Sequence, residues 1–511
     1  MSDNARLHDH EKLIAADEIN NIKHLKVKVQ FGEEDSATSV STSNPLPVSL
    51  GSETITITGD VNVGTSVSIN NTSENPVPIT GTVTQVTEPG YTDAFGKLRV
   101  SEPTTLGDYH HISGENPEMI LKTSGSGSGS AEVDSSSYIL SVGTGNGDYA
   151  IHQSTMYHHY LPGKSQLILE SFCFGEAREN TLKRVGYFDD RNGVFIQQSG
   201  DGSLSIVMRS YLTGSPQDIV VPQYEWNQDT CDESIQGSGT MPNGSSAPNF
   251  EKFGTWTLDP TKTQLIMIDF QWLGVGRLRI GFVHDGKWKI AHEFYHSNYV
   301  SDVYWTQPSL PIRCEIRNQG VAIGTATLKQ ICGSVMSEGG YIETGLVKII
   351  NSSLTGRILQ DGGDSLPILA IKLKNSFNGD AVRGIVRCLQ ASILVTNGPV
   401  YFELVRFDSH TSITGGSWIS QGSDSIVEYN ITATGYSNGY SVSGQFVEAA
   451  AAKSTTAAGQ IANPVTNKRG FITQNYDSTE SEAYAIVATA LGSSNNINIV
   501  TYSALQWSET R

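Results

Sequence analysis

The sequence predicts an all-β, multi-domain protein built from β-sandwich or jelly-roll units, and three observations support this fold class. Only 17% of the 511 residues are charged, against roughly 25% in typical soluble domains. Glycine fills 51 positions, and serine, threonine and asparagine are abundant, which favours short strands joined by tight turns. Many strand-like runs follow one another without helical patterns between them. A chain of this length is expected to form three or four separately packed units.

Residues 1–35 are predicted to be an N-terminal attachment segment. Apolar residues recur with helical spacing between residues 9 and 26, which predicts one short amphipathic helix running into a strand over 25–31. An element this short cannot bury its own apolar face, so we expect it to dock on a partner or a sister chain. A frayed tail is the alternative.

Residues 36–90 are predicted to form a slender β segment rich in threonine and valine. Two similar pieces, 44–51 and 75–81, each begin with a pair of prolines and lead into alternating strands over 54–58 and 82–86. Such a segment has too little surface to cover itself. Intertwining with identical chains in a homotrimer would close its edges, and packing against the next domain is the alternative.

The rest of the chain is predicted to be three β regions. Residues 91–336 form a main, jelly-roll-like sandwich with a long polar loop over 223–253, and strands over 138–142, 166–174, 193–197, 204–209, 264–272, 277–283 and 311–316. Residues 337–430 form a second sandwich with strands over 346–350, 366–373, 381–389 and 400–407. Residues 431–511 form a C-terminal β region, entered through 426–432 and including a strand over 497–502, with one or two helical turns over the alanine-rich 447–453.

Charge, apolar runs and cysteines exclude several classes of function. The net charge of −18 repels phosphate backbones, so we expect no nucleic-acid partner. No apolar run approaches the roughly 20 residues that cross a bilayer, and the N-terminus has no signal-peptide pattern, so we expect assembly in a cytoplasm and no membrane insertion. The five cysteines lack metal-binding spacing and are odd in number, which predicts reduced and mostly buried thiols.

The segment 292–296 matches the pattern H-E-x-x-H, which binds zinc when a helix places both histidines on one face. Here the neighbouring sequence favours a strand. On a strand, His292 and His296 would lie about 13 Å apart, at roughly 3.3 Å per residue, too far to share one zinc ion. We therefore interpret this segment as structural and expect no zinc catalysis.

Other short matches are also interpreted as structural. Gly435–Gly439 fits G-x-S-x-G but has strand-like sequence on both sides, and 274–281 resembles a dinucleotide loop with its third glycine misplaced. Two alternatives stay open. A metal ion could bind at the pairs His110-His111 and His158-His159, and calcium could bind around Asp201 or around Asp361 and Asp364. Asp189 and Asp190 are expected to cap a turn. We therefore predict no catalytic, cofactor-binding or metal-binding residues.

Four stretches together resemble a known family. They are 91–101 (YTDAFGKLRVS), 186–195 (GYFDDRNGVF), 272–282 (WLGVGRLRIGF) and 310–316 (LPIRCEI). In this order they resemble the core of a family of virion structural proteins of tailed bacteriophages, frequent among phages of cyanobacteria and often described as tail fibre proteins. The resemblance covers about residues 91–335, and Lys97 replaces an arginine that is usual in the first motif.

The resemblance implies a particle-bound β protein and brings no catalytic residues with it. We expect a non-enzymatic fibre or appendage subunit of a virion, a homotrimer attached to the tail, baseplate or neck through residues 1–90. Its sandwich domains would contact a host surface glycan or protein, and exposed Trp226 or Trp418 could stack on sugars. The alternatives are a head decoration or head-fibre protein and, in a different class, a glycan-degrading or metalloprotease tailspike enzyme.

Overall fold

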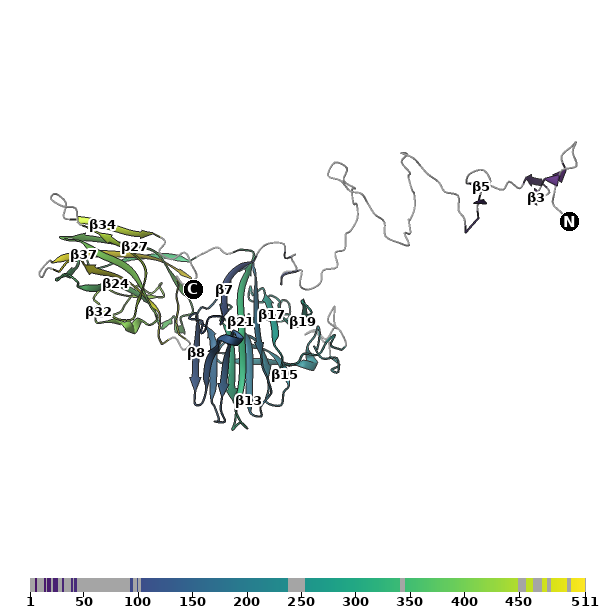
Figure 1. The fold of residues 1–511 in the computed structure, drawn as a ribbon, viewed down its shortest axis with the longest axis horizontal. Coiled ribbons are helices and arrows are strands. Elements are labelled where there is room, and N and C mark those ends of the chain that lie inside the picture. The colour runs from purple at the N-terminus through teal and green to yellow at the C-terminus, as the bar shows by residue number, and fades with distance from the viewer. Residues whose placement is uncertain are drawn as a thin grey trace. The chain divides into compact units, whose positions relative to one another are not determined.

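The computed structural model describes residues 103–237, 253–340, 345–448, 456–462, 471–475, 479–493 and 498–510, with residues 92–94, residue 99 and short stretches before residue 44. The chain divides into two compact units, Met1–Thr84 and Gln85–Arg511. The regular structure of the described residues consists of antiparallel strands and a few 3-10 turns, with no α-helix (Figure 1). The predicted all-β, multi-domain sandwich fold is therefore confirmed. None of the described residues belongs to a helix long and apolar enough to cross a membrane.

The main sandwich consists of two antiparallel sheets. The order of the first sheet is β19 (Lys287–Phe294), β18 (Leu278–His284), β17 (Gln264–Phe270), β12 (Ser165–Cys173), β21 (Ala326–Glu338), β10 (Ser137–Val142) and β9 (Ser128–Glu132), with β7 (Thr104–His110) also paired to β21. The order of the second sheet is β16 (Gln217–Pro222), β15 (Leu204–Ser210), β14 (Gly193–Gln198), β13 (Thr181–Phe188), β20 (Ile312–Asn318), β11 (Tyr149–Ser154) and β8 (Met119–Ser124). Two 3-10 turns, η2 (Val133–Ser135) and η3 (Gln223–Glu225), lie in the connections.

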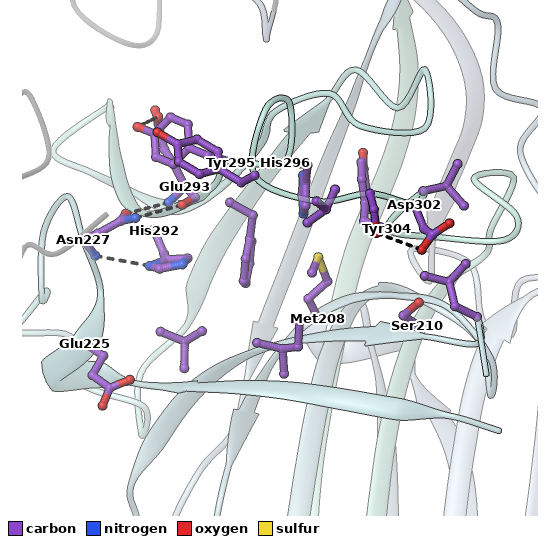
Figure 2. Close-up of a pocket in the computed structure, with 18 of the residues that line it drawn as sticks. Met208, Ser210, Glu225, Asn227, His292, Glu293, Tyr295, His296, Asp302 and Tyr304 are labelled. Carbon is purple, nitrogen blue, oxygen red and sulfur yellow. Dashed lines mark hydrogen bonds between the residues drawn. The ribbon is translucent and has the colours of Figure 1, made fainter. Parts of the chain in front are cut away.

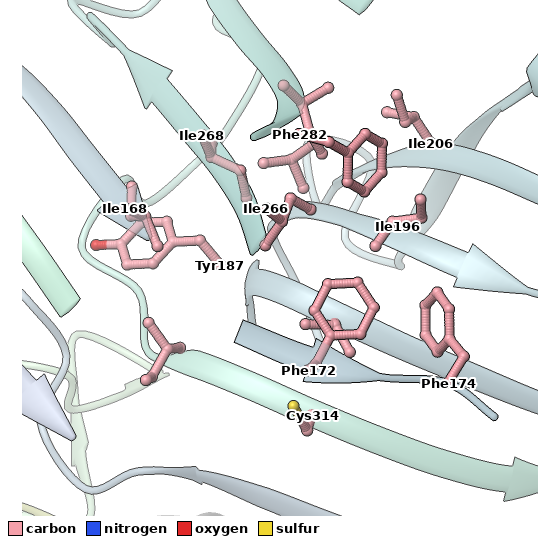
Figure 3. Close-up of a cluster of buried hydrophobic side chains, with 14 of the residues drawn as sticks. Ile168, Phe172, Phe174, Tyr187, Ile196, Ile206, Ile266, Ile268, Phe282 and Cys314 are labelled. Atoms are coloured by element: carbon pink, nitrogen blue, oxygen red, sulfur yellow. The ribbon is translucent and has the colours of Figure 1, made fainter. Parts of the chain in front are cut away.

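The core of the main sandwich lies between its two sheets. Side chains from the first sheet, such as Ile168 and Phe282, and from the second, such as Ile196 and Ile206, belong to one buried hydrophobic cluster (Figure 3). Alternate residues of a strand point to opposite faces, so each strand contributes every second side chain to this layer. The predicted strands of this region correspond to β10, β12, β14, β15, β17, β18 and β20.

The C-terminal sandwich consists of two sheets of six strands each. One contains β22 (Leu346–Asn351), β37 (Ile499–Thr510), β27 (Ile385–Thr396) and β34 (Thr456–Ala462), with β23 (Arg357–Leu359) on β37 and β35 (Phe471–Ile472) on β27. The other contains β30 (Ile419–Ser420), β31 (Val427–Asn430), β24 (Ser365–Leu373), β36 (Ala483–Ala490), β28 (Val400–Phe407) and β33 (Tyr440–Val447). Smaller elements are β25 (Ser376–Phe377) with β26 (Asp380–Ala381), β29 (Ile413–Thr414) with β32 (Gly435–Tyr436), and the 3-10 turn η4 (His410–Ser412).

Strands from 337–430 and from 431–511 alternate within these two sheets. β36 lies between β24 and β28, and β37 lies between β22 and β27. The sequence boundary drawn at residue 430 therefore does not separate two sheets, because the late strands occupy central positions beside the earlier ones.

The helix predicted between residues 9 and 26 is wrong for its described residues. Ala16–Ile19 and Ile22–Leu25 are the antiparallel strands β3 and β4, and β1 (Ala5–Arg6) pairs with β2 (Leu13–Ile14). The physical reason lies in helix energetics, since a short isolated helix is marginal in water and the intervening Asn20-Asn21 is a residue pair that hairpin turns favour. The predicted strand over 25–31 contributes only Leu25 to β4 and its last two residues to β5 (Gln30–Phe31), which pairs with β6 (Thr38–Ser39).

Two other predictions concern residues that are mostly outside the described ones. The slender segment over 36–90 is described only at residues 38–39 and 41–43. The predicted helical turn over 447–453 begins at Val447, the last residue of β33, and residues 449–455 are not described.

Candidate functional site

A cavity of about 970 Å³ lies along one edge of the main sandwich (Figure 2). One wall comes from β15 and β16, the last strands of the second sheet, and the opposite wall comes from the end of β19 and the loop that follows it. The turn η3 and the residues after it complete the cavity. Its lining residues with polar or aromatic groups are Ser210, Tyr224, Glu225, Asn227, His292, Glu293, Phe294, Tyr295, His296, Tyr299, Ser301, Asp302 and Tyr304.

Two buried histidines line this cavity, and a backbone group fixes one ring nitrogen of each. His292 Nδ1 accepts a hydrogen bond from the Asn227 amide at 3.2 Å, so its Nε2 carries the proton. His296 Nδ1 donates to the Gly276 carbonyl at 2.8 Å, so its Nε2 is an acceptor. No described residue bonds either Nε2. Burial lowers the pKa of both rings, that of His292 to about 3, so both are neutral at pH 7.

Aromatic rings connect the two histidines along the cavity wall. The His296 ring stacks on Tyr304, with centroids 3.9 Å apart and planes at 12°, and the Phe294 ring lies edge-to-face with His292 at 4.5 Å. Figure 2 shows His296 and Tyr304 on the side of the cavity opposite Met208. Ring packing of this kind holds each side chain in one orientation.

Two buried hydroxyl groups in the lining have no hydrogen-bond partner among the described residues. They are the Ser210 Oγ, at the end of β15, and the Tyr304 hydroxyl. Both oxygens are closed to a water molecule, so a ligand in the cavity does not reach them, and each is a buried polar group without a compensating bond.

The charge of the cavity is negative. Glu225, Glu293 and Asp302 line it, and the one described cation near these carboxylates is Arg277, whose Nη1 is 3.7 Å from Glu293 Oε2. The Tyr295 hydroxyl donates to Glu293 as well. An anionic ligand would therefore meet an unfavourable local potential.

The H-E-x-x-H segment begins on a strand, as predicted. His292 lies on β19, and His296 lies in the loop after it, so no helix places the two on one face. Among the described residues, no group of three or more histidine, cysteine or acidic side chains is arranged to hold a metal ion. The sequence did not predict that both histidines would line a cavity.

The other short motifs lie in turns and strands. Gly435 is in β32, and β33 starts one residue after Gly439, so strands flank this motif on both sides. In the 274–281 segment, a Cβ at Gly281 would lie 2.1 Å from the Lys289 carbonyl oxygen, beside a bulge between β18 and β19. Close backbone approach therefore accounts for this glycine.

Each histidine pair has one buried and one more exposed member, and Asp189 caps a turn. His158 is fully buried and bonded to Tyr109 and to the Leu310 carbonyl, whereas His110 is exposed. Asp189 Oδ1 accepts from the amides of Arg191 and Asn192 at 2.8 Å, which is the predicted turn cap.

The loop aspartates fill similar roles. Asp201 accepts from the Ser203 amide at 3.0 Å, and Asp364 accepts from the amides of Gln360 and Asp361 at 2.9 Å. These carboxylates satisfy the backbone of their own turns.

The two tryptophans proposed as exposed sugar platforms are not exposed. Trp226 is fully buried, belongs to the core cluster of the main sandwich and donates its indole N–H to the Val221 carbonyl at 3.1 Å. Trp418 is half-buried and packs against the C-terminal sandwich. The prediction of exposure is wrong for Trp226, because its indole fills an apolar gap in the core.

All five cysteines are free, as predicted. Cys231, Cys314 and Cys388 are buried, Cys173 is half-buried and Cys332 is exposed.

The first and third motif stretches meet around Asp269, which is completely buried on β17. Arg279 Nε donates to Asp269 Oδ1 at 2.7 Å, and Arg99 Nη2 donates to Asp269 Oδ2 at 2.7 Å. Arg279 also donates to the Thr92 carbonyl at 2.8 Å, and Arg277 to the Ala94 carbonyl at 3.1 Å. These contacts bind the chain before β7 to the first sheet.

The second and fourth motif stretches pair along β13 and β20, where Gly186 lies opposite Arg313. Glu315 is buried on β20 beside this pairing. It accepts from Arg313 Nη2 at 2.5 Å and from Arg317 Nε at 2.9 Å, and it pairs with Arg184 at 3.3 Å. Burial alone would raise the pKa of Glu315, but Arg313, Arg184 and Arg317 together hold it well below its usual range. Arg313 also pairs with Asp190 at 3.0 Å.

Sequence analysis missed the residues that make up the cavity. Ser210, Glu225 and Tyr304 carry no motif, and they come from segments that meet only when the two sheets pack. The one available signal was the pair of histidines four residues apart.

Comparisons with known proteins identify no family for this chain. No family model matches it, and no curated protein matches it. Among solved structures, it is similar to the endo-β-1,4-glucuronan lyase from the fungus Trichoderma reesei, with 11% identity over 47% of this chain and 100% of that chain and a TM-score of 0.28. It is also similar to the carbohydrate recognition domain of Emp46p in its potassium-bound form, with 11% identity over 44% and 90% of the two chains and a TM-score of 0.24.

A third similar structure is a glycosyl hydrolase family protein from Mycobacterium fortuitum, with 9% identity over 45% of this chain and 99% of that chain and a TM-score of 0.29. At these identities and TM-scores, the similarities assign no activity to this chain.

Proposed function

We propose that this protein is a non-enzymatic structural subunit of a tailed-phage virion, a fibre or appendage protein that forms a homotrimer and is assembled in the host cytoplasm. Residues 1–90 attach it to the tail, baseplate or neck, and the sandwiches contact the host surface.

The observation that carries this proposal is the structural role of the four motif stretches. The first and third stretches meet around the buried Asp269, and this network holds Thr92, Ala94 and Arg99 against the first sheet. The second and fourth stretches meet through the ion pair of Arg313 with Asp190. Bidentate and multiple arginine–carboxylate bonds define geometry well. A subunit attached through its N-terminal residues needs such a firm junction where the chain enters its first large domain.

Immunogold labelling of purified particles, with antibodies raised against the recombinant chain, tests the location. Label on the tail, baseplate or neck supports the proposal. Label confined to the head would instead favour the alternative of a head decoration or head-fibre protein, and unlabelled particles would overturn the virion assignment.

The homotrimer is tested by size-exclusion chromatography with light scattering on the full chain. The expected mass is three times the chain mass of 55.2 kDa. A mass equal to that of one chain at assembly concentrations would contradict the trimer.

The cavity gives the glycan-degrading alternative a specific observation, because Glu225 and Glu293 both line it and glycosidases use paired carboxylates. Incubating the purified protein with host envelope glycans, with and without a chelator, separates the two hypotheses. Release of shorter glycans would overturn the non-enzymatic assignment, and loss of that release with chelator would indicate a metal-dependent enzyme.

A further inference from the structure

We propose that the cavity between β15–β16 and the end of β19 is a binding site for a neutral oligosaccharide. This inference deepens the host-contact part of the proposed function and names the chemistry of the ligand.

The size of the cavity fits a ligand larger than a single sugar. Its volume of about 970 Å³ lies at the upper end of the roughly 300–1,000 Å³ found for small-molecule sites. Aliphatic side chains of β15 and β16, among them Met208, Ile219 and Val221, form one wall, and the aromatic row that includes Phe294 and Tyr304 forms the other. Such walls suit the C–H faces of pyranose rings.

The polar groups of the lining include donors and acceptors that the protein itself leaves unused. His292 offers an Nε2–H donor and His296 an Nε2 acceptor, and both side chains are more than nine-tenths buried.

The presence of both a donor and an acceptor between apolar walls favours a polyhydroxylated ligand over an alkyl one. An alkyl chain in the cavity would displace water from these groups and leave them unpaired, which costs binding free energy. The hydroxyls of a sugar donate and accept at alternating positions around an apolar ring, so one ligand can satisfy both kinds of group.

The charge of the cavity selects a neutral sugar. Glu225 and Asp302 line it with no described cation beside them, and Arg277 lies next to Glu293. The net charge of −18 adds to this negative potential. Uronic or sialic acids would be repelled, whereas an uncharged hexose chain meets carboxylate oxygens that accept hydrogen bonds from its hydroxyls.

The test is binding of the full chain to an array of neutral and acidic oligosaccharides, followed by titration calorimetry with the neutral trisaccharides maltotriose, cellotriose and mannotriose. We expect neutral glycans to bind and glucuronate-containing or sialylated ones not to bind. Binding of acidic glycans alone, or of none on the array, would overturn the proposal.

Two variants place the ligand in the cavity. Glu225→Ala and Asp302→Ala each remove an exposed carboxylate of the lining, so the fold should keep its thermal stability while the affinity falls about five- to tenfold. The matched control is Glu179→Ala, because Glu179 is an exposed carboxylate of the same sandwich that does not line the cavity.

Equal affinity in Glu225→Ala, Asp302→Ala and the control would place the sugar elsewhere and contradict the site. Because these measurements use the purified chain, their failure is distinct from failure of the virion assignment, which immunogold labelling decides.

Discussion

Glu170 is a buried carboxyl group at the centre of the main sandwich, on β12. Its Oε1 accepts from Gln330 Nε2 at 2.9 Å and from the Cys314 thiol at 3.2 Å, and its Oε2 has no described partner. Gln330 in turn bonds His152 at 2.6 Å. Burial raises the pKa of Glu170 to about 8, and the two hydrogen bonds offset only part of this effect. The carboxyl group is therefore mostly protonated at pH 7.

This protonation makes stability depend on pH in a defined direction. The pKa of Glu170 is about 8 in the folded state and 4.5 in the ordinary case. Between these two pH values the carboxyl group is protonated in the folded chain and ionised in the unfolded chain, so the free energy of unfolding falls as pH rises. The loss should reach about 1.4 kcal/mol for each pH unit within this window. Glu170→Gln, which keeps the acceptor oxygen, should remove that contribution.

Thermal unfolding between pH 5 and 9 measures this effect. The melting temperature of the wild type should fall with rising pH relative to that of the Glu170→Gln variant, whereas parallel curves would contradict the assigned protonation state.

Asp269 should be the carboxylate whose charge matters most to the junction before β7. Asp269→Asn leaves Arg279 without its hydrogen-bonded carboxylate and leaves Arg99 with Glu338 alone, and breaking a buried ion pair costs about 3–5 kcal/mol. Asp285→Asn removes the same charge from the β18–β19 turn, where the carboxylate side chain is 90% exposed, and should change stability by less than about 1 kcal/mol. Chemical denaturation of both variants provides the comparison, and equal losses would contradict the structural role of the first motif.

At the scale of elements, period-two alternation predicted the strands that have one buried face. β10 and β28 lie where the sequence places them, and buried residues alternate with less buried ones along most of each strand. β36 (Ala483–Ala490) was missed as a strand. Nearly all of its residues are buried, so alternation is absent, and alanine is uncommon in strands.

The candidate site could not be predicted in the same way. Ser210 and Tyr304 lie 94 positions apart in the chain and approach only because β16 and β19 are the edge strands of two packed sheets. A local pattern reports the face of one strand, and it carries no information on which two sheet edges will enclose a cavity.

Gly281 gives an element-scale test of the 272–282 motif. A Cβ there would lie 2.1 Å from the Lys289 carbonyl oxygen and 2.7 Å from Ile290 Cα, so Gly281→Ala should force β18 and β19 apart. We expect a loss of at least about 1–3 kcal/mol, by the same physics as overpacking in a core. Denaturation with urea measures it, and an unchanged midpoint would show that the bulge between these strands adapts freely.

At the scale of the whole molecule, the net charge of −18 opposes self-association. Three copies in the proposed trimer would bring three such charges together, and salt at 0.1 M screens repulsion between charges more than about 10 Å apart. The trimer mass fraction measured by light scattering should therefore increase between 20 and 300 mM sodium chloride. A decrease would indicate that attraction between opposite charges dominates the contact between copies.

The five thiols differ in accessibility, and this difference has a practical use. Cys332, on β21, is the exposed one, while Cys231, Cys314 and Cys388 are enclosed in the protein interior. A maleimide reagent should therefore attach a fluorophore or a heavy-atom cluster preferentially at this position without any engineered residue. The native chain thus carries its own marker for tracing the sandwich in electron micrographs or single-molecule recordings.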